Sequence, residues 1–275
     1  MLLRTVFSLL CLVVPALGWV PLTPGMTFQW QLQGTIDTTV NADVFDVDLF
    51  DASTSVINTL KSNGKVVICY FSAGSYENWR SDVSGVPSSA LGNPLDGWAG
   101  EKWWDIRVTA VRDVIISRLN EAQNKGCDAV EPDNVDGYQN SNGLGLSQAD
   151  QLDFNKWMAV EARKRCLSVG LKNAVDLLND LEPYFDWALN EECLDYNECS
   201  GYSVFLNHNK ASRPVRHVDR TGPCVFMGAV FHVEYVDNQS QGPAKQTAVC
   251  NNANRPSGFT TLIKTWDLYA WRLTC

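Results

Sequence analysis

The stretch DAVEPDNVDGY, residues 128–138, places Asp128, Glu131, Asp133 and Asp136 within nine positions and contains no basic residue. Carboxylates this close repel each other, so the fold must either separate them or use them. Two carboxyl groups that flank a glycosidic bond can divide its hydrolysis. One donates a proton to the leaving oxygen, and the other attacks the sugar or activates water. The alternative is that these acids are solvated loop residues.

Other kinds of site fit the sequence poorly. An EF-hand loop starting at Pro132 would lack its first ligand and, at Gly143, its last glutamate. No GxSxG elbow surrounds Ser75, and GLGLSQ at 143–148 lacks the third glycine of a dinucleotide fingerprint. The three histidines form no HExxH motif, and the cysteines form neither a CxxC pair nor a Cys/His quartet. The sequence therefore predicts no metal and no cofactor.

Short apolar runs alternate with helical patterns along the chain, and this alternation favours an α/β fold. Eight runs rich in β-branched or aromatic residues predict strands: Phe28–Gln33, Val44–Leu49, Val66–Phe71, Ala129–Asp133, Ser168–Asn173, Trp187–Glu191, Val230–Tyr235 and Thr260–Lys264. Four stretches predict helices, with Ser147 as an N-cap and Gly126 as a C-terminal stop: Ser53–Ser62, Asp105–Lys125, Ser147–Arg165 and Ala174–Leu181.

Eight strands with helical crossovers predict a single (β/α)8 barrel of the TIM type. Its first β/α unit is expected to be irregular, because residues 34–43 are too few for a crossover helix. Residues 81–100 and 141–147 are rich in Gly, Ser, Pro and Asn, and we expect loops there. An open, doubly wound sheet is the alternative architecture.

Side-chain parity directs several acids to one side of the predicted barrel wall. In the strand VFDVDLFD, the odd positions are apolar, and Asp46 and Asp48 occupy even positions. In AVEPD, Glu131 and Asp133 share a face. Because successive residues of a strand point to opposite sides, we expect the apolar set to face the helices and these acids to face the barrel interior.

Four acids fall near the C-terminal ends of their predicted strands: Asp48, Asp133, Glu191 and Glu234. In a TIM-type barrel these strand ends form the mouth that holds the active site. A charged group pointing into a barrel is costly unless it sits at this open end. The sequence therefore predicts a carboxylate-lined site at the mouth.

Residues 1–18 have the layout of a signal peptide. Arg4 is followed by an apolar run from Val6 to Leu17 that only Ser8 interrupts, and small residues end the segment. The run is too short for a membrane span. We expect a secreted protein whose mature domain is 19–275; a buried N-terminal strand or helix is the alternative.

Eight of the nine cysteines lie beyond this segment, and an even number favours disulfides in an oxidising compartment. The expected pairs are Cys193–Cys199 and Cys127–Cys166. The net charge of −9 argues against nucleic acid and anionic membranes and favours a cationic partner. Ten tryptophans offer flat apolar faces to sugar rings. Together these features favour a secreted, monomeric polysaccharide hydrolase.

Six motifs, in this order, resemble those of glycoside hydrolase family 114, the endo-α-1,4-polygalactosaminidases: FQWQLQG, FDVDLFD, VICYFSAGSYENWR, GCDAVEPDNVDGY, ALNEEC and VFHVEY. The similarity extends from Thr27 to Arg272. It implies a TIM-type barrel and endo-acting hydrolysis of α-1,4-linked galactosamine in galactosaminogalactan-like polysaccharides. Where it is N-deacetylated, such a substrate is polycationic and matches the acidic chain.

The resemblance also implies site residues. The family's catalytic carboxylates fall on Asp133, expected to be the nucleophile or base, and on Glu191, expected to be the general acid. Glu131 and Glu192 compete with them, since a shift of one residue in strand register exchanges Glu191 and Glu192. Matching positions expected to bind substrate or to support the pair are Gln31, Asp48, Tyr70, Glu131, Lys172, Asn173, Glu192 and Tyr235.

Two other functions remain open. A non-catalytic carbohydrate-binding or cell-wall protein on the same barrel would keep the aromatic residues and lose at least one acid, whereas this chain has acids at both expected positions. A hydrolase of another amino-sugar polymer, or a deacetylase, is the second; no zinc triad is visible for deacetylation.

Overall fold

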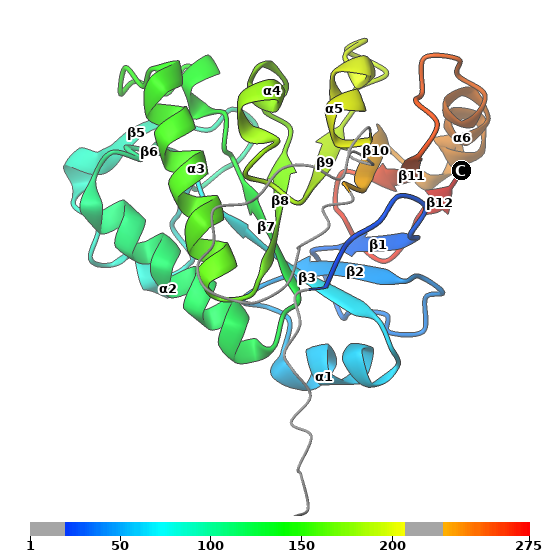
Figure 1. The fold of residues 1–275 in the computed structure, drawn as a ribbon, viewed down its shortest axis with the longest axis horizontal. Helices are drawn as coiled ribbons and strands as arrows, with labels where there is room; N and C mark the ends of the chain where they lie inside the picture. The colour runs from blue at the N-terminus through cyan, green and yellow to red at the C-terminus, as the bar shows by residue number, and fades with distance from the viewer. Residues whose placement is uncertain (1–19, 207–227) are drawn as a thin grey trace, which may run out of the picture.

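The computed structural model describes residues 20–206 and 228–275 (Figure 1). The predicted signal peptide lies outside the described residues. Within them, nine strands form one sheet in the order β1, β2, β3, β7, β8, β9, β10, β11 and β12. Their bounds are β1 (Phe28–Gln31), β2 (Val44–Asp48), β3 (Val66–Ser72), β7 (Ala129–Asp133), β8 (Ser168–Lys172), β9 (Trp187–Glu191), β10 (Val230–Val236), β11 (Phe259–Thr265) and β12 (Leu273–Thr274).

All eight predicted strands are present, as β1 to β3 and β7 to β11, and each pairs in parallel with its neighbours. The added β12 pairs antiparallel with β11. Strand order follows chain order without the reversal that marks a doubly wound sheet. The prediction of an α/β barrel is therefore confirmed, although hydrogen bonding between strands does not close it.

The two edges of the sheet are bridged by the segment that follows β11. Leu268 O accepts hydrogen bonds from the backbone amides of Leu32 and Gln33, at 3.1 and 3.3 Å. From β1 itself, Gln29 Nε2 donates to Ala270 O at 2.8 Å. The β1–β2 connection contains no helix, as its length predicts. We call this bridged junction of residues 28–33 with 268–272 the seam.

Helices cover the outer face of the sheet (Figure 1). They are α1 (Thr54–Ser62), α2 (Thr109–Lys125), α3 (Gln148–Lys164), α4 (Leu178–Leu181), α5 (Ser203–Leu206) and α6 (Gly242–Cys250). Ser147 caps α3 through a capping box with Asp150, and Gly126 ends α2 in the left-handed region at φ 84°. In the described part of the chain, no helix combines the length and apolar composition needed to cross a bilayer.

A small antiparallel sheet interrupts the barrel between β3 and α2. It consists of β4 (Ser75–Glu77), β5 (Leu91–Pro94) and β6 (Glu101–Trp104), with β6 in the centre. The sequence predicted only a loop over 81–100, because Gly, Pro and Asn obscure the short strands. We call residues 75–104 the excursion.

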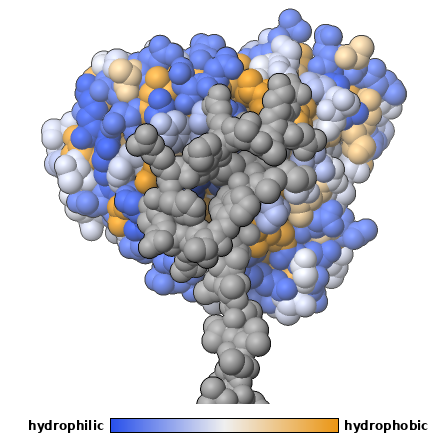
Figure 2. All heavy atoms as spheres, viewed as in Figure 1, coloured by the Kyte–Doolittle hydropathy of each residue, from blue (hydrophilic) through white to orange (hydrophobic). Residues whose placement is uncertain are grey.

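Two apolar layers lie on the two faces of the barrel wall, as strand parity predicts. Phe45 and Val47 belong to the layer that packs against the helices, whereas Trp30 and Ile68 belong to the layer inside the barrel. Gly170 leaves room inside for Trp187, whose ring would lie 2.4 Å from an added Cβ. On the face seen in Figure 2, hydrophilic residues dominate the described surface.

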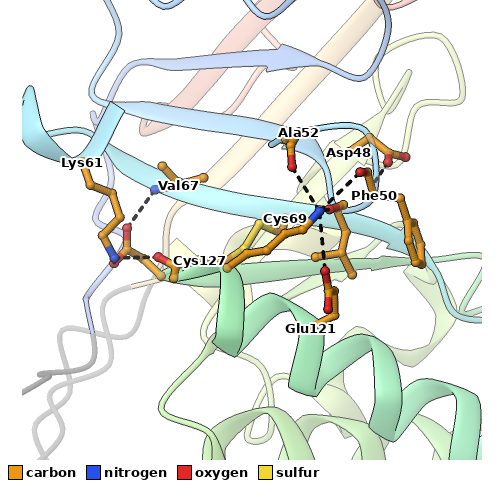
Figure 3. Close-up of a disulfide and its surroundings, with 12 residues drawn as sticks. Asp48, Phe50, Ala52, Lys61, Val67, Cys69, Glu121 and Cys127 are labelled. Carbon is orange, nitrogen blue, oxygen red and sulfur yellow. Dashed lines mark hydrogen bonds and ion pairs between the residues drawn. A yellow bond between two sulfur atoms is a disulfide. The ribbon is translucent and has the colours of Figure 1, made fainter. Parts of the chain in front are cut away.

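Three disulfides lie within the described residues. The predicted Cys193–Cys199 pair is confirmed, and Cys250 pairs with Cys275. The predicted Cys127–Cys166 pair is wrong, because Cys127 bonds to Cys69 (Figure 3). Cys69 lies on the helix-facing side of β3, and Cys127 directly precedes β7, the strand that pairs with β3. Spacing along the chain cannot reveal this neighbourhood.

Asp128, the first acid of the opening stretch, helps to join these same elements. Its carboxylate accepts hydrogen bonds from Lys61 Nζ at 2.8 Å and from the Val67 amide at 3.0 Å (Figure 3). It therefore ties α1 and β3 to the start of β7, at the opposite end of the strand from Asp133. Its role is structural.

Candidate active site

Lys172 lies between the two candidate catalytic carboxylates. Asp133 ends β7, Lys172 ends β8 and Glu191 ends β9. Lys172 Nζ is 3.4 Å from Asp133 Oδ1 and 3.3 Å from Glu191 Oε2. These two oxygens are therefore at most 6.7 Å apart, the sum of the two distances. Burial lowers the pKa of Lys172, but the charges of Asp133, Glu131 and Glu191 more than reverse this and raise it well above its usual value.

Each carboxylate is held by donors from neighbouring strands. Asp133 accepts hydrogen bonds from Tyr70 OH at 3.0 Å and from the Asn134 amide at 2.8 Å. Glu191 accepts them from Tyr235 OH at 2.5 Å and from Asn173 Nδ2 at 2.9 Å. Because the Asp133 and Glu191 side chains remain 20% and 24% exposed, both can meet a ligand.

The backbone leaves the wall of the barrel in an unusual way at this point. Asn134, Asn173 and Glu192 directly follow β7, β8 and β9, and their φ angles are 60°, 44° and 62°. Non-glycine residues in the left-handed region store strain and often mark functional sites. The register of β9 directs Glu191 toward Lys172, so Glu191 and not Glu192 completes the cluster, although Glu192 also lines the cleft.

A second carboxyl pair lies beneath this cluster. Glu131 is fully buried and accepts hydrogen bonds from Lys172 Nζ at 3.0 Å and from Trp30 Nε1 at 3.1 Å. Asp46 is also fully buried, and its carboxyl group lies beside that of Glu131, with no donor from the described residues reaching its two oxygens. Burial, reinforced by the charge of Glu131, raises the pKa of Asp46 well above its usual range. Asp46 is therefore protonated and donates to Glu131.

The structure places three of the expected residues outside the lining of the cleft. Glu131 does not line the cleft, and its hydrogen bond to Lys172 joins it to the site. Gln31 lies on the outer side of β1, and its amide holds the following loop at Gln33, Thr35 and Asp37. Glu234 also points away from the mouth.

The surroundings of Glu234 explain its orientation. It alternates with Val233 and Tyr235, which lie in the interior layer. Its carboxylate faces His232 Nε2 and Lys245 Nζ, each at 3.0 Å. Near the mouth, by contrast, Asp48 does line the cleft, and its carboxylate pairs with Arg80 at 2.6 Å.

The cluster lies in a cleft of about 1200 Å³ at the barrel mouth. Among the described residues, twelve acids line the cleft: Asp48, Asp51, Glu77, Asp96, Glu101, Asp133, Asp136, Asp176, Glu191, Glu192, Glu198 and Asp267. The basic residues there are Arg80 and Lys172, and both pair with carboxylates. Burial raises the pKa of Glu101 to about 7, and burial with the charge of Asp133 raises that of Asp136 to about 6.

Aromatic side chains on the cleft wall escaped the sequence analysis. They are Trp79, Trp98, Tyr196, Trp266 and Tyr269, each at least half exposed. All five lie outside the barrel strands, in segments whose sequence has no periodicity to reveal a direction. Acids and aromatic faces together suit a polyhydroxylated, cationic ligand.

Comparisons with known proteins show which family and which solved structures this chain resembles. The family model described as glycoside-hydrolase family GH114 matches residues 13–275. The crystal structure of Aspergillus fumigatus Ega3 in complex with galactosamine is 39% identical, with a TM-score of 0.83, over 94% of this chain and 98% of that one. A search among curated proteins finds no match.

More distant structures share the fold. The glycoside hydrolase domain of PelA from Pseudomonas aeruginosa is 12% identical, with a TM-score of 0.64, over 91% of this chain and 98% of that one. A GH18 chitinase from Pseudoalteromonas aurantia is 13% identical, with a TM-score of 0.53, over 87% and 93%. The match over residues 13–275 and the identity with Ega3 establish that this chain belongs to glycoside hydrolase family GH114 and is a glycosidase.

Proposed function

We propose that this protein is a secreted, endo-acting glycosidase that hydrolyses α-1,4-linked galactosamine polysaccharides of the galactosaminogalactan type. The observation that carries the proposal is the pair Asp133 and Glu191, joined by Lys172 inside a cleft lined by twelve acids. The 39% identity with an enzyme solved in complex with galactosamine supports the choice of sugar. The disulfides are compatible with export.

The geometry supports a division of labour between the two acids. Asp133 serves as nucleophile, and Glu191 donates its proton to the leaving oxygen and then activates the water that releases the product. Retaining enzymes place their carboxyl groups about 5–5.5 Å apart, and inverting enzymes about 6.5–9.5 Å. The limit of 6.7 Å between Asp133 Oδ1 and Glu191 Oε2 includes the retaining separation and reaches the shortest inverting ones, so it is compatible with Asp133 as the nucleophile.

The charge of the cleft supports a cationic polymer. Among the residues that the structure describes, twelve acids face two basic residues that are already paired, so this lining carries excess negative charge that attracts ammonium groups. N-deacetylated galactosamine units carry such groups. A neutral, fully N-acetylated chain would leave this charge without a partner.

Product analysis by mass spectrometry tests the proposal. Purified protein is incubated with N-deacetylated α-1,4-galactosamine oligomers and, in parallel, with chitosan. Shorter galactosamine products with untouched chitosan support the proposal. Cleavage of chitosan alone would identify a hydrolase of another amino-sugar polymer, and binding without cleavage of either would favour a carbohydrate-binding protein.

Isosteric variants test the two acids. Asp133→Asn and Glu191→Gln should abolish turnover and keep the fold, since each preserves side-chain shape. Asp153→Asn is a matched control, because Asp153 pairs with Arg112 on the surface and is 69% exposed. A near-normal rate in either active-site variant rejects the assignment of that residue.

A further inference from the structure

Within residues 20–206 and 228–275, the prominently exposed aromatic side chains are gathered in one place. In the described part of the chain, six large apolar side chains are prominently exposed, and five of them are the aromatic residues of the cleft. The sixth, Val160, lies on α3 away from the cleft. Apolar residues exposed by chance are scattered singly over a surface, whereas a gathered set marks a binding surface.

Three of the five rings are supported from one side. Trp266 stacks on Tyr235 with ring centres 3.9 Å apart and planes within 13°. A Cβ on Gly34 would lie 2.7 Å from the ring of Tyr269, and a Cβ on Gly100 would lie 3.0 Å from the ring of Trp79. Glycine at these two positions leaves room for the rings to lie close against the backbone.

Four of the five rings fall into two groups, one on each side of the catalytic pair. Trp79 and Trp98 belong to the excursion, which precedes β7 and therefore lies on the side of Asp133. Trp266 and Tyr269 follow β11, which pairs with β10. Tyr235 of β10 both contacts Trp266 and donates to Glu191, so this group lies on the side of Glu191.

A carboxylate accompanies a tryptophan in each group. Asp96 lies two residues before Trp98, and Asp267 directly follows Trp266. All four side chains are exposed and line the cleft. An amino sugar presents an apolar ring face and an ammonium group, and a tryptophan beside a carboxylate is complementary to both.

We propose that Trp98 with Asp96, and Trp266 with Asp267, form two distal subsites for N-deacetylated amino-sugar units, on opposite sides of Asp133 and Glu191. This inference deepens the proposed function and rests on it for the kind of sugar. The two subsites bind long chains across the catalytic pair. They also discriminate between free and acetylated amino groups, because acetylation removes the charge that Asp96 and Asp267 recognise.

Calorimetric binding to the inactive full-length Asp133→Asn protein tests the subsites. In this inactive background, Trp98→Ala and Trp266→Ala should each raise the Kd for long galactosamine oligomers about tenfold, equivalent to about 1.4 kcal/mol. The Kd of a disaccharide should stay unchanged. Trp98→Phe and Trp266→Phe keep a ring and should recover most of the affinity. Val160→Ala is the control for an exposed apolar residue outside the cleft.

A separate binding measurement tests the carboxylates of Asp96 and Asp267. Asp96→Asn and Asp267→Asn should weaken binding of N-deacetylated oligomers and leave binding of N-acetylated oligomers unchanged. If both Asn variants weaken binding of N-deacetylated and N-acetylated oligomers equally, charge recognition is rejected. If the Ala variants bind long and short oligomers as the parent does, the subsites themselves are rejected; should an Ala variant fail to fold, its Phe and Asn counterparts decide.

Turnover separates this inference from the proposed function. If the otherwise wild-type protein cleaves the polymer, and Trp98→Ala and Trp266→Ala leave KM for long chains unchanged, the subsites fail and the function stands. If no polymer is cleaved, yet binding of long oligomers depends on Trp98 and Trp266, the function fails and the subsites stand.

Discussion

Asp46 and Glu131 hold two carboxyl groups in contact inside the barrel, and Glu131 accepts a hydrogen bond from Lys172 at 3.0 Å. Both acids are fully buried. Two carboxyl groups that are buried side by side cannot both stay ionised. They therefore share one proton, which resides on Asp46. The negative charge of Glu131 offsets part of the positive charge of Lys172. It thereby weakens the attraction of Lys172 for Asp133 and Glu191.

This arrangement predicts opposite outcomes for two isosteric changes. Asp46→Asn keeps a neutral donor toward Glu131, so kcat/KM should stay close to that of the wild type. Glu131→Gln removes the charge that balances Lys172, and kcat/KM should fall roughly 10- to 100-fold, in line with about 1.5–3 kcal/mol for a hydrogen bond to a charged group. Equal losses in both variants would show that Asp46 is ionised.

Tyr235 joins the carboxylate pair to the aromatic wall, since its hydroxyl donates to Glu191 and its ring stacks on Trp266. Tyr235→Phe removes the hydroxyl and keeps the ring. We expect kcat to fall about tenfold or more, with little change in KM, because the hydrogen bond that positions Glu191 for proton transfer is lost. Steady-state kinetics on galactosamine oligomers measures the changes in kcat and KM separately. Tyr184→Phe serves as control, because the Tyr184 ring lies beside Lys156 of α3 and does not line the cleft. A rise in KM alone would assign Tyr235 to substrate binding.

Glu101 predicts a pH dependence of stability. Burial raises its pKa from 4.5 to about 7 in the folded protein, so the folded state holds a proton that the unfolded chain releases. The stability that this proton confers is complete below pH 4.5 and is lost as the pH rises through about 7. Glu101→Gln keeps an acceptor for Ser75 and removes the titration. Urea unfolding between pH 4.5 and 7 should therefore show a smaller decline for the variant than for the wild type; parallel curves would refute the shift.

The Cys69–Cys127 disulfide closes a loop of 58 residues that includes the whole excursion. Replacing both cysteines by alanine should lower the free energy of unfolding by about 4 kcal/mol, the loop entropy expected at this separation. Activity below the melting transition should persist, because neither cysteine lines the cleft. Denaturant unfolding measures the loss. The Cys193–Cys199 loop, with a separation of only 6, should contribute less to chain entropy; the reverse order would contradict this account.

Sequence patterns predict the barrel because its strands carry strong and redundant signals. In the second strand, apolar Phe45 and Val47 alternate with Asp46 and Asp48, and this alternation alone determines which side faces the helices. The excursion carries no such signal, since its strands are short and rich in Gly and Pro. The GPAKQTAVC segment of α6 also carries no clear helix signal, because it lacks an apolar stripe.

The residues of the candidate site show the same contrast between positions that sequence patterns indicate and positions that they do not. Parity and motif order identify Asp133, Glu191 and Lys172, which the strand ends bring together. Gln31 was misplaced because motif order alone does not determine the direction of its side chain. The Asp46–Glu131 contact and the Cys69–Cys127 bond depend on which strands are neighbours across the sheet, and the chain order of motifs does not contain that information.

The seam has a consequence for how the chain is made. Gln29 and its partner Ala270 are 241 residues apart, so the free edge of the first barrel strand stays uncovered until the segment around residue 270 has been made. At about 5–20 residues per second, a ribosome needs roughly 10–50 s to synthesise the intervening chain. During that interval the growing protein presents an unpaired strand edge, which is a template for pairing with another chain.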